Sequence, residues 1–251
     1  MAAPVTLITG ASAGLGAEFA RQCARRGEPL VLVARRRDRL EAIAAEVVGA
    51  TVISADLAQA GAAERLMAEL AGQGLEAGTL INNAGFGLTG HFDALPLDRQ
   101  REMVDLNIRT LVELSRLVLP AMLERKQGGI LNVASTAAFQ PGPYFAVYFA
   151  SKAFVLSFTE ALHQEVKGTG VRVSALCPGP TATEFGEVAG VTSARFDRLS
   201  ASAAAVVAAG LRGLDRNKAI VIPGAMNKAT AQAGRVIPRS AMRRIVASLK
   251  I

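Results

Sequence analysis

Residues 9–16 read Thr9-Gly10-Ala11-Ser12-Ala13-Gly14-Leu15-Gly16, directly after the apolar run 5–9 and at the start of a segment with helical period. Glycines between a strand and a helix let the backbone approach a phosphate closely, and the amides and the helix dipole then stabilise its charge. The GxxxGxG spacing is less common than GxGxxG, so its position between a strand and a helix gives the motif its weight. It predicts a turn that binds the pyrophosphate of a dinucleotide through Gly10, Ser12, Ala13, Gly14, Leu15 and Gly16.

The rest of the chain continues this alternation of short apolar runs and longer segments of helical period. Strands are expected at residues 5–9, 30–34, 51–55, 79–82, 129–134, 172–177 and 219–222. Helices are expected at residues 14–26, 37–48, 62–73, 97–125, 147–167 and 201–214. The pattern predicts an α/β, doubly wound, Rossmann-like fold: a parallel seven-stranded sheet with helices on both faces. Residues 1–251 are expected to form a single domain, with a basic C-terminal extension at 223–251.

The charge of the chain is concentrated near its end. The 251 residues carry 28 Lys and Arg against 21 Asp and Glu, a formal net charge of +7. Residues 216–251 hold eight of the basic residues and no acidic one, so the other 215 residues are almost neutral. A charge confined to one tail argues against nucleic acid as a partner.

Cys23 and Cys177 have neither disulfide nor metal-ligand spacing, so we expect buried free thiols and no metal site.

A cluster of arginines follows the second expected strand. An acidic residue at this point normally binds the ribose of NAD(H). Here Ala34 takes that place and Arg35-Arg36-Arg37 follow it, and guanidinium groups suit the 2′-phosphate of NADP(H). NADP(H) is therefore favoured over NAD(H), with Arg35 as the first choice for the phosphate contact and Arg36 as the second. Arg37 and Arg39 are interpreted as the start of a solvated helix.

Asp56, with Leu57 beside it, follows the third expected strand and can meet the adenine of the same nucleotide. The alternative is that Asp56 is the N-cap of the next helix, and the sequence leaves both interpretations open.

Two side chains with complementary acid–base chemistry stand four residues apart in the expected helix 147–167. Tyr148 and Lys152 project from one face of that helix, where a lysine ammonium is expected to lower the phenol pKa and favour the phenolate. Tyr148 can then exchange a proton with a carbonyl or alcohol oxygen. Ser135 follows an apolar strand, at the sheet edge where ligands bind, and can stabilise the developing oxyanion. Each residue alone also has a structural interpretation as a cap, a core residue or a surface charge.

Together these positions resemble the short-chain dehydrogenases/reductases of the single-domain type with about 250 residues. The match runs from residue 9 to residue 183. Within the family, the sequence is most similar to the bacterial branch of 3-hydroxy-acid dehydrogenases and carbonyl reductases. The resemblance implies that Lys152 binds the nicotinamide ribose and that Asn107 supports a water that connects Lys152 to solvent. It further implies cofactor contacts in the segments after the strands 79–82 and 172–177, at Asn83, Ala84, Gly85, Pro178, Gly179, Thr181 and Thr183. Thr181 departs from the family, which often has an aliphatic residue there, so Thr183 has the better claim to the nicotinamide carboxamide.

The sequence therefore predicts an NADP(H)-dependent oxidoreductase that transfers a hydride between nicotinamide and a carbonyl or secondary alcohol, with Tyr148 as general acid and base. The alternatives are a non-catalytic NADP(H)-binding sensor or scaffold and a membrane-associated reductase of acyl or steroid-like ketones. An apolar ketone or alcohol is the expected substrate, and its pocket is expected from Phe86, Leu88, residues 140–145 and the loop 185–196.

A cytoplasmic homodimer or homotetramer is expected. His91 and His163 are interpreted as surface residues. Residues 237–251 can form a basic amphipathic helix, for which docking within the protein or oligomer is preferred over contact with a membrane surface.

Overall fold

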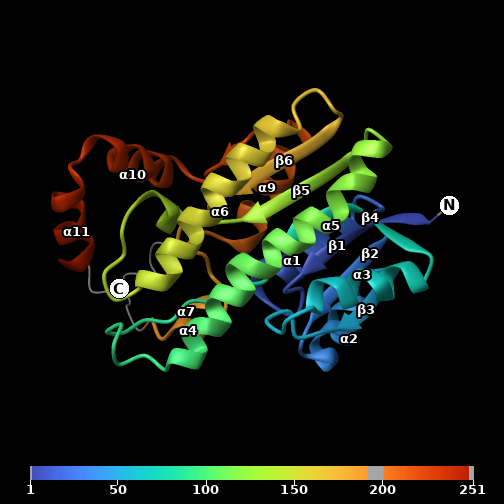
Figure 1. Cartoon of the computed structure of the whole chain (residues 1–251), viewed down its shortest axis with the longest axis horizontal. Helices are drawn as coiled ribbons and strands as arrows, with labels where there is room; N and C mark the ends of the chain where they lie inside the picture. Colours follow the sequence, from blue (N-terminus) through green and yellow to red (C-terminus); the bar gives the residue numbers. More distant parts are fainter. Residues whose placement is uncertain (1, 192–199, 249–251) are drawn as a thin grey trace.

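The computed structural model describes residues 2–191 and 200–248, which fold around one central sheet (Figure 1). All neighbouring strands pair in parallel, in the order β3-β2-β1-β4-β5-β6-β7. The predicted α/β, doubly wound, Rossmann-like fold is confirmed, and the strand that departs most from its expected bounds is β4, which starts at Leu75 rather than at residue 79. The strands are β1 (Ala3–Thr9), β2 (Leu30–Ala34), β3 (Ala50–Ser54), β4 (Leu75–Asn82), β5 (Gly128–Val133), β6 (Val171–Leu176) and β7 (Ile220–Val221).

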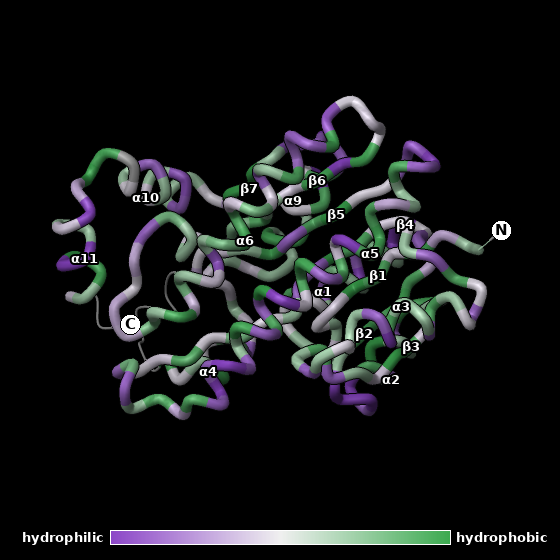
Figure 2. Tube along the Cα trace, viewed as in Figure 1, coloured by the Kyte–Doolittle hydropathy of each residue, from purple (hydrophilic) through white to green (hydrophobic). Residues whose placement is uncertain are grey.

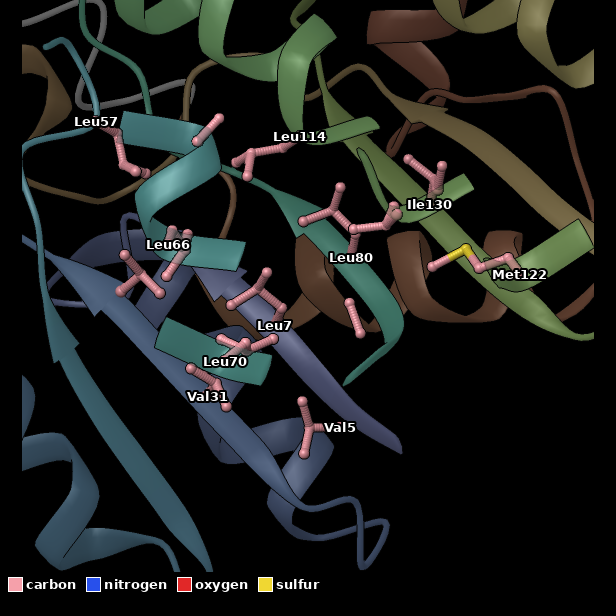
Figure 3. Close-up of a cluster of buried hydrophobic side chains, with 14 of the residues drawn as sticks. Val5, Leu7, Val31, Leu57, Leu66, Leu70, Leu80, Leu114, Met122 and Ile130 are labelled. Atoms are coloured by element: carbon pink, nitrogen blue, oxygen red, sulfur yellow. The ribbon is translucent and has the colours of Figure 1, made fainter. Parts of the chain in front are cut away.

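Helices cover both faces of the sheet. On one face lie α1 (Gly14–Ala24), α2 (Arg37–Glu46) and α9 (Ala203–Asp215), and on the other α3 (Ala62–Gly72), α5 (Thr110–Glu124) and α6 (Ala146–Glu165). All residues of β2 are buried, which explains why its sequence is continuously apolar instead of alternating. A hydrophobic core lies on each face of the sheet. Figure 3 shows the core on the face of α3 and α5, which includes Leu7, Val31, Leu80, Leu66, Leu70, Leu114 and Met122.

Buried amides fix the register at the carboxyl ends of β4 and β5. Asn82 and Asn132 are direct partners in the strand pairing, and Asn82 Nδ2 donates a hydrogen bond of 2.9 Å to Asn132 Oδ1. Asn132 Nδ2 donates in turn to Thr159 Oγ1 of α6 at 3.0 Å. A slip of one strand against the other would leave these buried groups without partners, so the network holds the strand ends at a defined height.

The order of the strands reverses at β1. The chain runs from β1 outward to β2 and β3, and then returns to place β4 on the other side of β1. The connections after β1 and β4 therefore diverge and leave a crevice at the carboxyl ends of these strands, where open α/β sheets bind their ligands.

The expected helix 97–125 is interrupted, and this is a correction to the sequence analysis. It consists of α4 (Leu97–Val104), the π-helical turn η1 (Asp105–Arg109) and α5. Asn107 lies in the π-turn, where its side chain hydrogen-bonds the backbone of Phe86 from a distant part of the chain. The interruption therefore depends on a tertiary contact, which a helical pattern in the sequence does not report.

The expected loop 185–196 is also partly wrong. Its first residues form the short helix α7 (Phe185–Ala189), which ends at Gly190 with a left-handed φ of 75°. Residues 192–199, including Phe196, lie outside the described residues.

Two helices follow β7 and lie at one end of the molecule (Figure 1): α10 (Ala225–Val236) and α11 (Arg239–Ser248). Hydrophilic and hydrophobic residues interchange along α11, as Figure 2 shows. Met242 and Val246 of α11 are buried in a cluster with Phe86 and Tyr148, whereas Arg243 and Arg244 are exposed. The apolar side of this amphipathic helix therefore docks on its own chain.

Candidate active site

The glycine turn after β1 is too tight for other residues. A Cβ at Gly16 would lie 2.0 Å from the Gly10 carbonyl oxygen, and Gly10 and Gly14 have left-handed φ values of 66° and 55°. Ala13 is the N-cap of α1, and no side chain in the described parts of the chain forms a capping hydrogen bond there. The first turn of α1 also carries no acidic residue. Free amides at the positive end of a helix fit the phosphates of a dinucleotide.

Asn83 holds this turn against the end of β4. Its Nδ2 donates hydrogen bonds to the carbonyl oxygens of Thr9 at 3.0 Å and Gly10 at 3.2 Å. The amides of Asn83 and Ala84 both donate to Thr9 Oγ1 at 3.0 Å. The side chain of Asn83 therefore connects the ends of β1 and β4, and its side-chain N–H groups are occupied by protein carbonyls.

The arginines after β2 lie at the surface beside the glycine turn, each with a partner. Arg35 forms an ion pair of 3.0 Å with Glu102, and Arg36 Nη2 lies 3.4 Å from Ser12 Oγ. Arg36 and Arg39 also contact Glu184, from the segment after β6. Arg39 is therefore more than the start of a solvated helix, which corrects the sequence analysis. Arg37 has the expected role, since it is 62% exposed and pairs with Glu41 one helical turn away.

Asp56 is not the N-cap of the next helix. That position belongs to Gly61, at the start of α3. Asp56 Oδ1 instead accepts a hydrogen bond of 3.1 Å from the amide of Ala58, so the carboxylate stabilises a local turn. The side chain of Leu57 is 3% exposed and packs into the core, which leaves only its backbone for a nucleotide contact.

Tyr148, Ser135 and Lys152 converge at the end of β5. Lys152 Nζ donates a hydrogen bond of 2.8 Å to the carbonyl of Val133, the last residue of β5, and lies 5.8 Å from the centre of the Tyr148 ring. Ser135 accepts from the amide of Ala137 at 3.1 Å and caps the short 3-10 helix η2 (Thr136–Phe139). The same hydroxyl lies close enough to the phenol of Tyr148 to lower its pKa. Ser135 is thus both a cap and a neighbour of the phenol.

The expected lowering of the Tyr148 pKa by Lys152 is wrong for this structure. Burial raises the pKa of Tyr148 to about 12, and the hydrogen bond from Ser135 lowers it by a smaller amount. Burial also lowers the pKa of Lys152 to about 8. Both shifts favour the uncharged forms, because the two side chains are only 8% and 6% exposed.

Asn107, Gly85 and Lys152 meet on the other side of this site. Asn107 Nδ2 donates to the Phe86 carbonyl at 3.0 Å and to Ser151 Oγ at 3.1 Å, and its Oδ1 accepts from the Phe86 amide at 3.1 Å. A Cβ at Gly85 would lie 2.8 Å from Asn107 Oδ1 and 3.5 Å from Lys152 Nζ. The absence of a side chain at Gly85 therefore lets Asn107 and Lys152 reach the end of β4.

The segment after β6 reaches across to the glycine turn. The Pro178 carbonyl accepts hydrogen bonds from the amide of Thr136 at 2.8 Å and from Ser135 Oγ at 3.4 Å. Thr181 is 7% exposed and donates to the Gly179 carbonyl, so its hydroxyl is turned inward. The side chain of Thr183 lies against Gly14, where an added Cβ would be 3.2 Å from Thr183 Cβ. Thr183 thus lies nearer than Thr181 to the expected cofactor position.

Aromatic side chains enclose Tyr148. Its ring centroid lies 5.2 Å from that of Phe185, 5.4 Å from Phe145 and 6.1 Å from Phe149. Phe86 and Leu88 belong to the same cluster, as expected for a pocket lining. The contribution of α11 to this cluster was not predicted, although its amphipathic period is visible in the sequence. The other residues that were not predicted here are Glu184, Glu102, Met103, Met242 and Val246.

The remaining reactive side chains are two cysteines and two histidines, of which Cys177 lies close enough to Lys152 to influence its pKa. Cys23 and Cys177 are buried free thiols, as predicted. His91 is exposed, but His163 is half-buried and its Nδ1 lies 2.7 Å from the Val173 carbonyl oxygen, so the surface role expected for it is wrong. Within residues 2–191 and 200–248, no group of three or more His, Cys, Asp or Glu is arranged to hold a metal ion. No helix in that same part of the chain is long and apolar enough to cross a membrane.

The family model described as short chain dehydrogenase matches residues 4–193. The chain therefore belongs to the short-chain dehydrogenase family, a class of oxidoreductases, and the resemblance seen in residues 9–183 is confirmed.

Relatives with curated names and a solved structure agree with this family. The NADP-dependent 3-hydroxy acid dehydrogenase YdfG of Salmonella typhi is 39% identical over 189 residues, which are 73% of this chain and 75% of the relative. The very-long-chain 3-oxoacyl-CoA reductase of Anas platyrhynchos is 37% identical over 192 residues, which are 72% of this chain but only 61% of the reductase. A solved short-chain dehydrogenase from Sphingobium yanoikuyae, in complex with NADPH, has a TM-score of 0.82 at 34% identity and 93% coverage of both chains.

Proposed function

We propose that the chain is an NADP(H)-dependent oxidoreductase that transfers a hydride between nicotinamide and a carbonyl or secondary alcohol, with Tyr148 as general acid and base. The observation that carries this proposal is the convergence of Tyr148, Ser135 and Lys152 at the end of β5, beside the crevice that the glycine turn lines. A proton donor, a buried amine and a phosphate-binding turn at one crevice are the parts that such a reaction needs.

The side chains of the site have distinct roles in carbonyl reduction. Bound NADPH supplies the hydride that is added to the carbonyl carbon. Ser135 holds the carbonyl oxygen beside Tyr148 and stabilises its developing negative charge. Tyr148 gives its proton to that oxygen, which leaves an alcohol and a phenolate. With its pKa raised to about 12, the phenol is still a much stronger acid than an alcohol and stays protonated at neutral pH, which favours reduction over oxidation.

Lys152 and Asn107 support the phenol. A Lys152 pKa of about 8 lets this side chain gain or lose a proton near neutral pH, so it can restore the proton that Tyr148 has given up. Lys152 also reaches Gly85, where the nicotinamide ribose is expected. The side-chain amide of Asn107 uses both N–H donors and one acceptor position in hydrogen bonds to Phe86 and Ser151, so we assign Asn107 a positioning role. A water that connects Lys152 to solvent would bind the backbone carbonyl of Asn107 or the remaining lone pair of its Oδ1.

NADP(H) is the proposed cofactor, on the strength of Arg35 and Arg36 beside the glycine turn. Relatives that are named as NADP-dependent or solved with NADPH support the same choice. The phosphates would contact the turn Gly10–Gly16, and the adenosine and nicotinamide would contact the segments after β3, β4 and β6. Among these, Thr183, Gly85 and the backbone of Leu57 are best placed.

We propose an apolar ketone or acyl compound as the substrate class, because aromatic side chains enclose Tyr148. The two named relatives act, by their names, on a 3-hydroxy acid and a 3-oxoacyl thioester.

We propose a homodimer or homotetramer, since Leu117 of α5 and Phe154 of α6 are 38% and 40% exposed on neighbouring helices. A single domain over the whole chain, a cytoplasmic location and the lack of a nucleic-acid partner stay predictions.

The test is a screen of ketones, 3-oxoacyl thioesters and hydroxy acids with the wild-type chain and the Tyr148→Phe variant. We expect Tyr148→Phe to lower turnover by at least about 100-fold while NADPH binding changes little. Tyr144→Phe, at an exposed tyrosine in the expected pocket segment 140–145, removes a phenol without removing the proposed proton donor, so its turnover should fall far less than that of Tyr148→Phe. Unchanged turnover in Tyr148→Phe would contradict the acid–base role. NADPH binding without turnover of any carbonyl would instead favour a non-catalytic sensor.

A further inference from the structure

Three consecutive residues after β6 contact three separate parts of the site. Thr183 lies against Gly14 of the glycine turn. Phe185 packs on the ring of Tyr148, with 5.2 Å between ring centroids. Glu184, between them, reaches the arginines that follow β2. The nucleotide end of the site and the proposed acid–base residue are therefore connected through one short stretch of chain.

Glu184 lies between two guanidinium groups. Arg39 Nη1 contacts both carboxylate oxygens, at 2.7 and 2.9 Å, and Arg36 Nη2 lies 3.6 Å from Oε2. The hydrogen bonds from Arg39, with the charge of Arg36, hold the pKa of Glu184 below its ordinary value, so the carboxylate is charged. Arg36 also reaches Ser12 in the glycine turn. A carboxylate in this position presents the charge and hydrogen-bond acceptors that a phosphate monoester would present.

We propose that Glu184 is a positioning and specificity residue: its carboxylate occupies the arginine pair when no 2′-phosphate is bound, and a 2′-phosphate displaces it and frees Phe185 from the ring of Tyr148. This inference rests on the proposed use of NADP(H), because it takes Arg36 as a ligand of the 2′-phosphate. It adds that cofactor choice and access to Tyr148 are linked through Glu184.

The strength of the contacts suits such an exchange. The side chains of Arg36, Arg39 and Glu184 are 46%, 43% and 47% exposed. Ion pairs at this exposure change an equilibrium by only about two- to fivefold, so they can be displaced by a stronger ligand. A 2′-phosphate carries nearly two negative charges and three acceptor oxygens at neutral pH, whereas a nucleotide that lacks it offers these arginines no competing anion.

The movement that follows would be local. The far end of α7 is held by a hydrogen bond of 3.0 Å from the Thr89 amide to the Ala189 carbonyl. Release of Glu184 therefore acts on the near end of α7, where Phe185 is the residue that covers Tyr148. Access of solvent and substrate to the phenol should increase when the 2′-phosphate is bound.

The composition of the chain allows a direct measurement. It has two tyrosines and no tryptophan, so Tyr148 is the sole tyrosine emitter in a Tyr144→Phe background. Acrylamide quenching of its emission reports how exposed the ring is. The probes are 2′,5′-ADP, which carries the 2′-phosphate but no nicotinamide, and 5′-AMP, which lacks both. Because neither nucleotide has a nicotinamide carboxamide, neither can act on Thr183 through that group. An effect on Tyr148 that 2′,5′-ADP has and 5′-AMP lacks must therefore come from the 2′-phosphate and the arginines after β2.

In the Tyr144→Phe protein we expect saturating 2′,5′-ADP to raise the quenching constant by at least about twofold and 5′-AMP to leave it unchanged. Adding Glu184→Gln should raise quenching without any nucleotide, abolish the further response and tighten 2′,5′-ADP binding by about two- to fivefold. Glu187→Gln is the matched control: Glu187 lies in α7, three residues after Glu184, is exposed, forms no ion pair with another described residue and should behave as its parent. Thermal unfolding of each variant shows that it is folded.

The outcomes separate this inference from the proposed function. If 2′,5′-ADP binds the parent but quenching does not change, or if Glu184→Gln matches Glu187→Gln, the coupling is wrong and NADP(H) dependence stands. If neither 2′,5′-ADP nor NADPH binds the parent, both the coupling and the proposed cofactor are overturned.

Discussion

Lys152 Nζ and the carbonyl oxygen of Val133 are joined by a 2.8 Å hydrogen bond that lies inside the protein. Desolvation lowers the pKa of this amine from 10.5 to about 8. Between these two values the unfolded chain binds the proton and the folded chain does not. The contribution of Lys152 to the free energy of unfolding should therefore rise with pH through this window, and it is lost as pH falls through 8.

We expect Lys152→Met to remove this dependence. The free energy of unfolding of the wild type, relative to Lys152→Met, should rise by about 2 kcal/mol between pH 8 and pH 10. Urea unfolding of both proteins at several pH values measures it, and the comparison removes the opposite contributions of Cys23, Cys177 and Tyr148, whose pKa values are raised by burial in both proteins. Parallel curves for the two proteins would show that Lys152 is not desolvated.

Gly85→Ala tests the close approach of Asn107. The new Cβ would lie 2.8 Å from Asn107 Oδ1, so the amide must move and weaken its hydrogen bonds to Phe86. We expect turnover to fall at least about tenfold and the free energy of unfolding to fall by about 1–3 kcal/mol. Gly72→Ala, at the end of α3 with open space around it, should be neutral or slightly stabilising. Equal behaviour of the two variants would contradict the crowding at Gly85.

Glu102 forms a 3.0 Å ion pair with Arg35 and should therefore compete with the 2′-phosphate of NADPH for this guanidinium group. Glu102→Gln should tighten NADPH binding by about two- to fivefold and leave NADH binding unchanged, because only NADPH carries the 2′-phosphate. Arg35→Ala should have the opposite effect and weaken NADPH far more than NADH. Calorimetric titration of both nucleotides measures this, and equal changes for the two would exclude the phosphate contact.

Met242 anchors α11 on the cluster that contains Tyr148. It is 6% exposed, so Met242→Ala should lower the free energy of unfolding by about 2–4 kcal/mol in urea. Met226 of α10 is 77% exposed, and Met226→Ala should change it by less than about 0.5 kcal/mol. If the free energy of unfolding fell by a similarly small amount in both variants, α11 would not be docked as described.

The sheet was predictable because buried parallel strands are continuous apolar runs. Leu30–Ala34 is such a run, whereas Val171–Leu176 is apolar except at Arg172 and Ser174, and the helical segments between the strands are long enough for crossovers. The π-turn at Asn107 was not predictable, since it depends on the backbone of Phe86, which is remote in sequence.

The convergence of Tyr148, Lys152 and Ser135 was predictable, but the pKa shifts of Tyr148 and Lys152 were not. The spacing of Tyr148 and Lys152 shows that they share a helix face, but it does not show how deeply Phe145 and Phe185 bury the phenol. The Arg39–Glu184 contact spans 145 residues, and an ion pair at that separation leaves no local signal.

The π-turn at Asp105–Arg109 constrains the length of the chain as well as the position of Asn107. A single π-turn amounts to one residue added to an α-helix, and each residue of an α-helix turns the chain by about 100°. Deleting one residue from this turn would restore regular helical winding and rotate α4 relative to α5 by that angle. The side chains of Gln100 and Met103 would then leave their buried positions. Within an otherwise helical stretch, this turn should therefore tolerate substitution far better than any change in residue number.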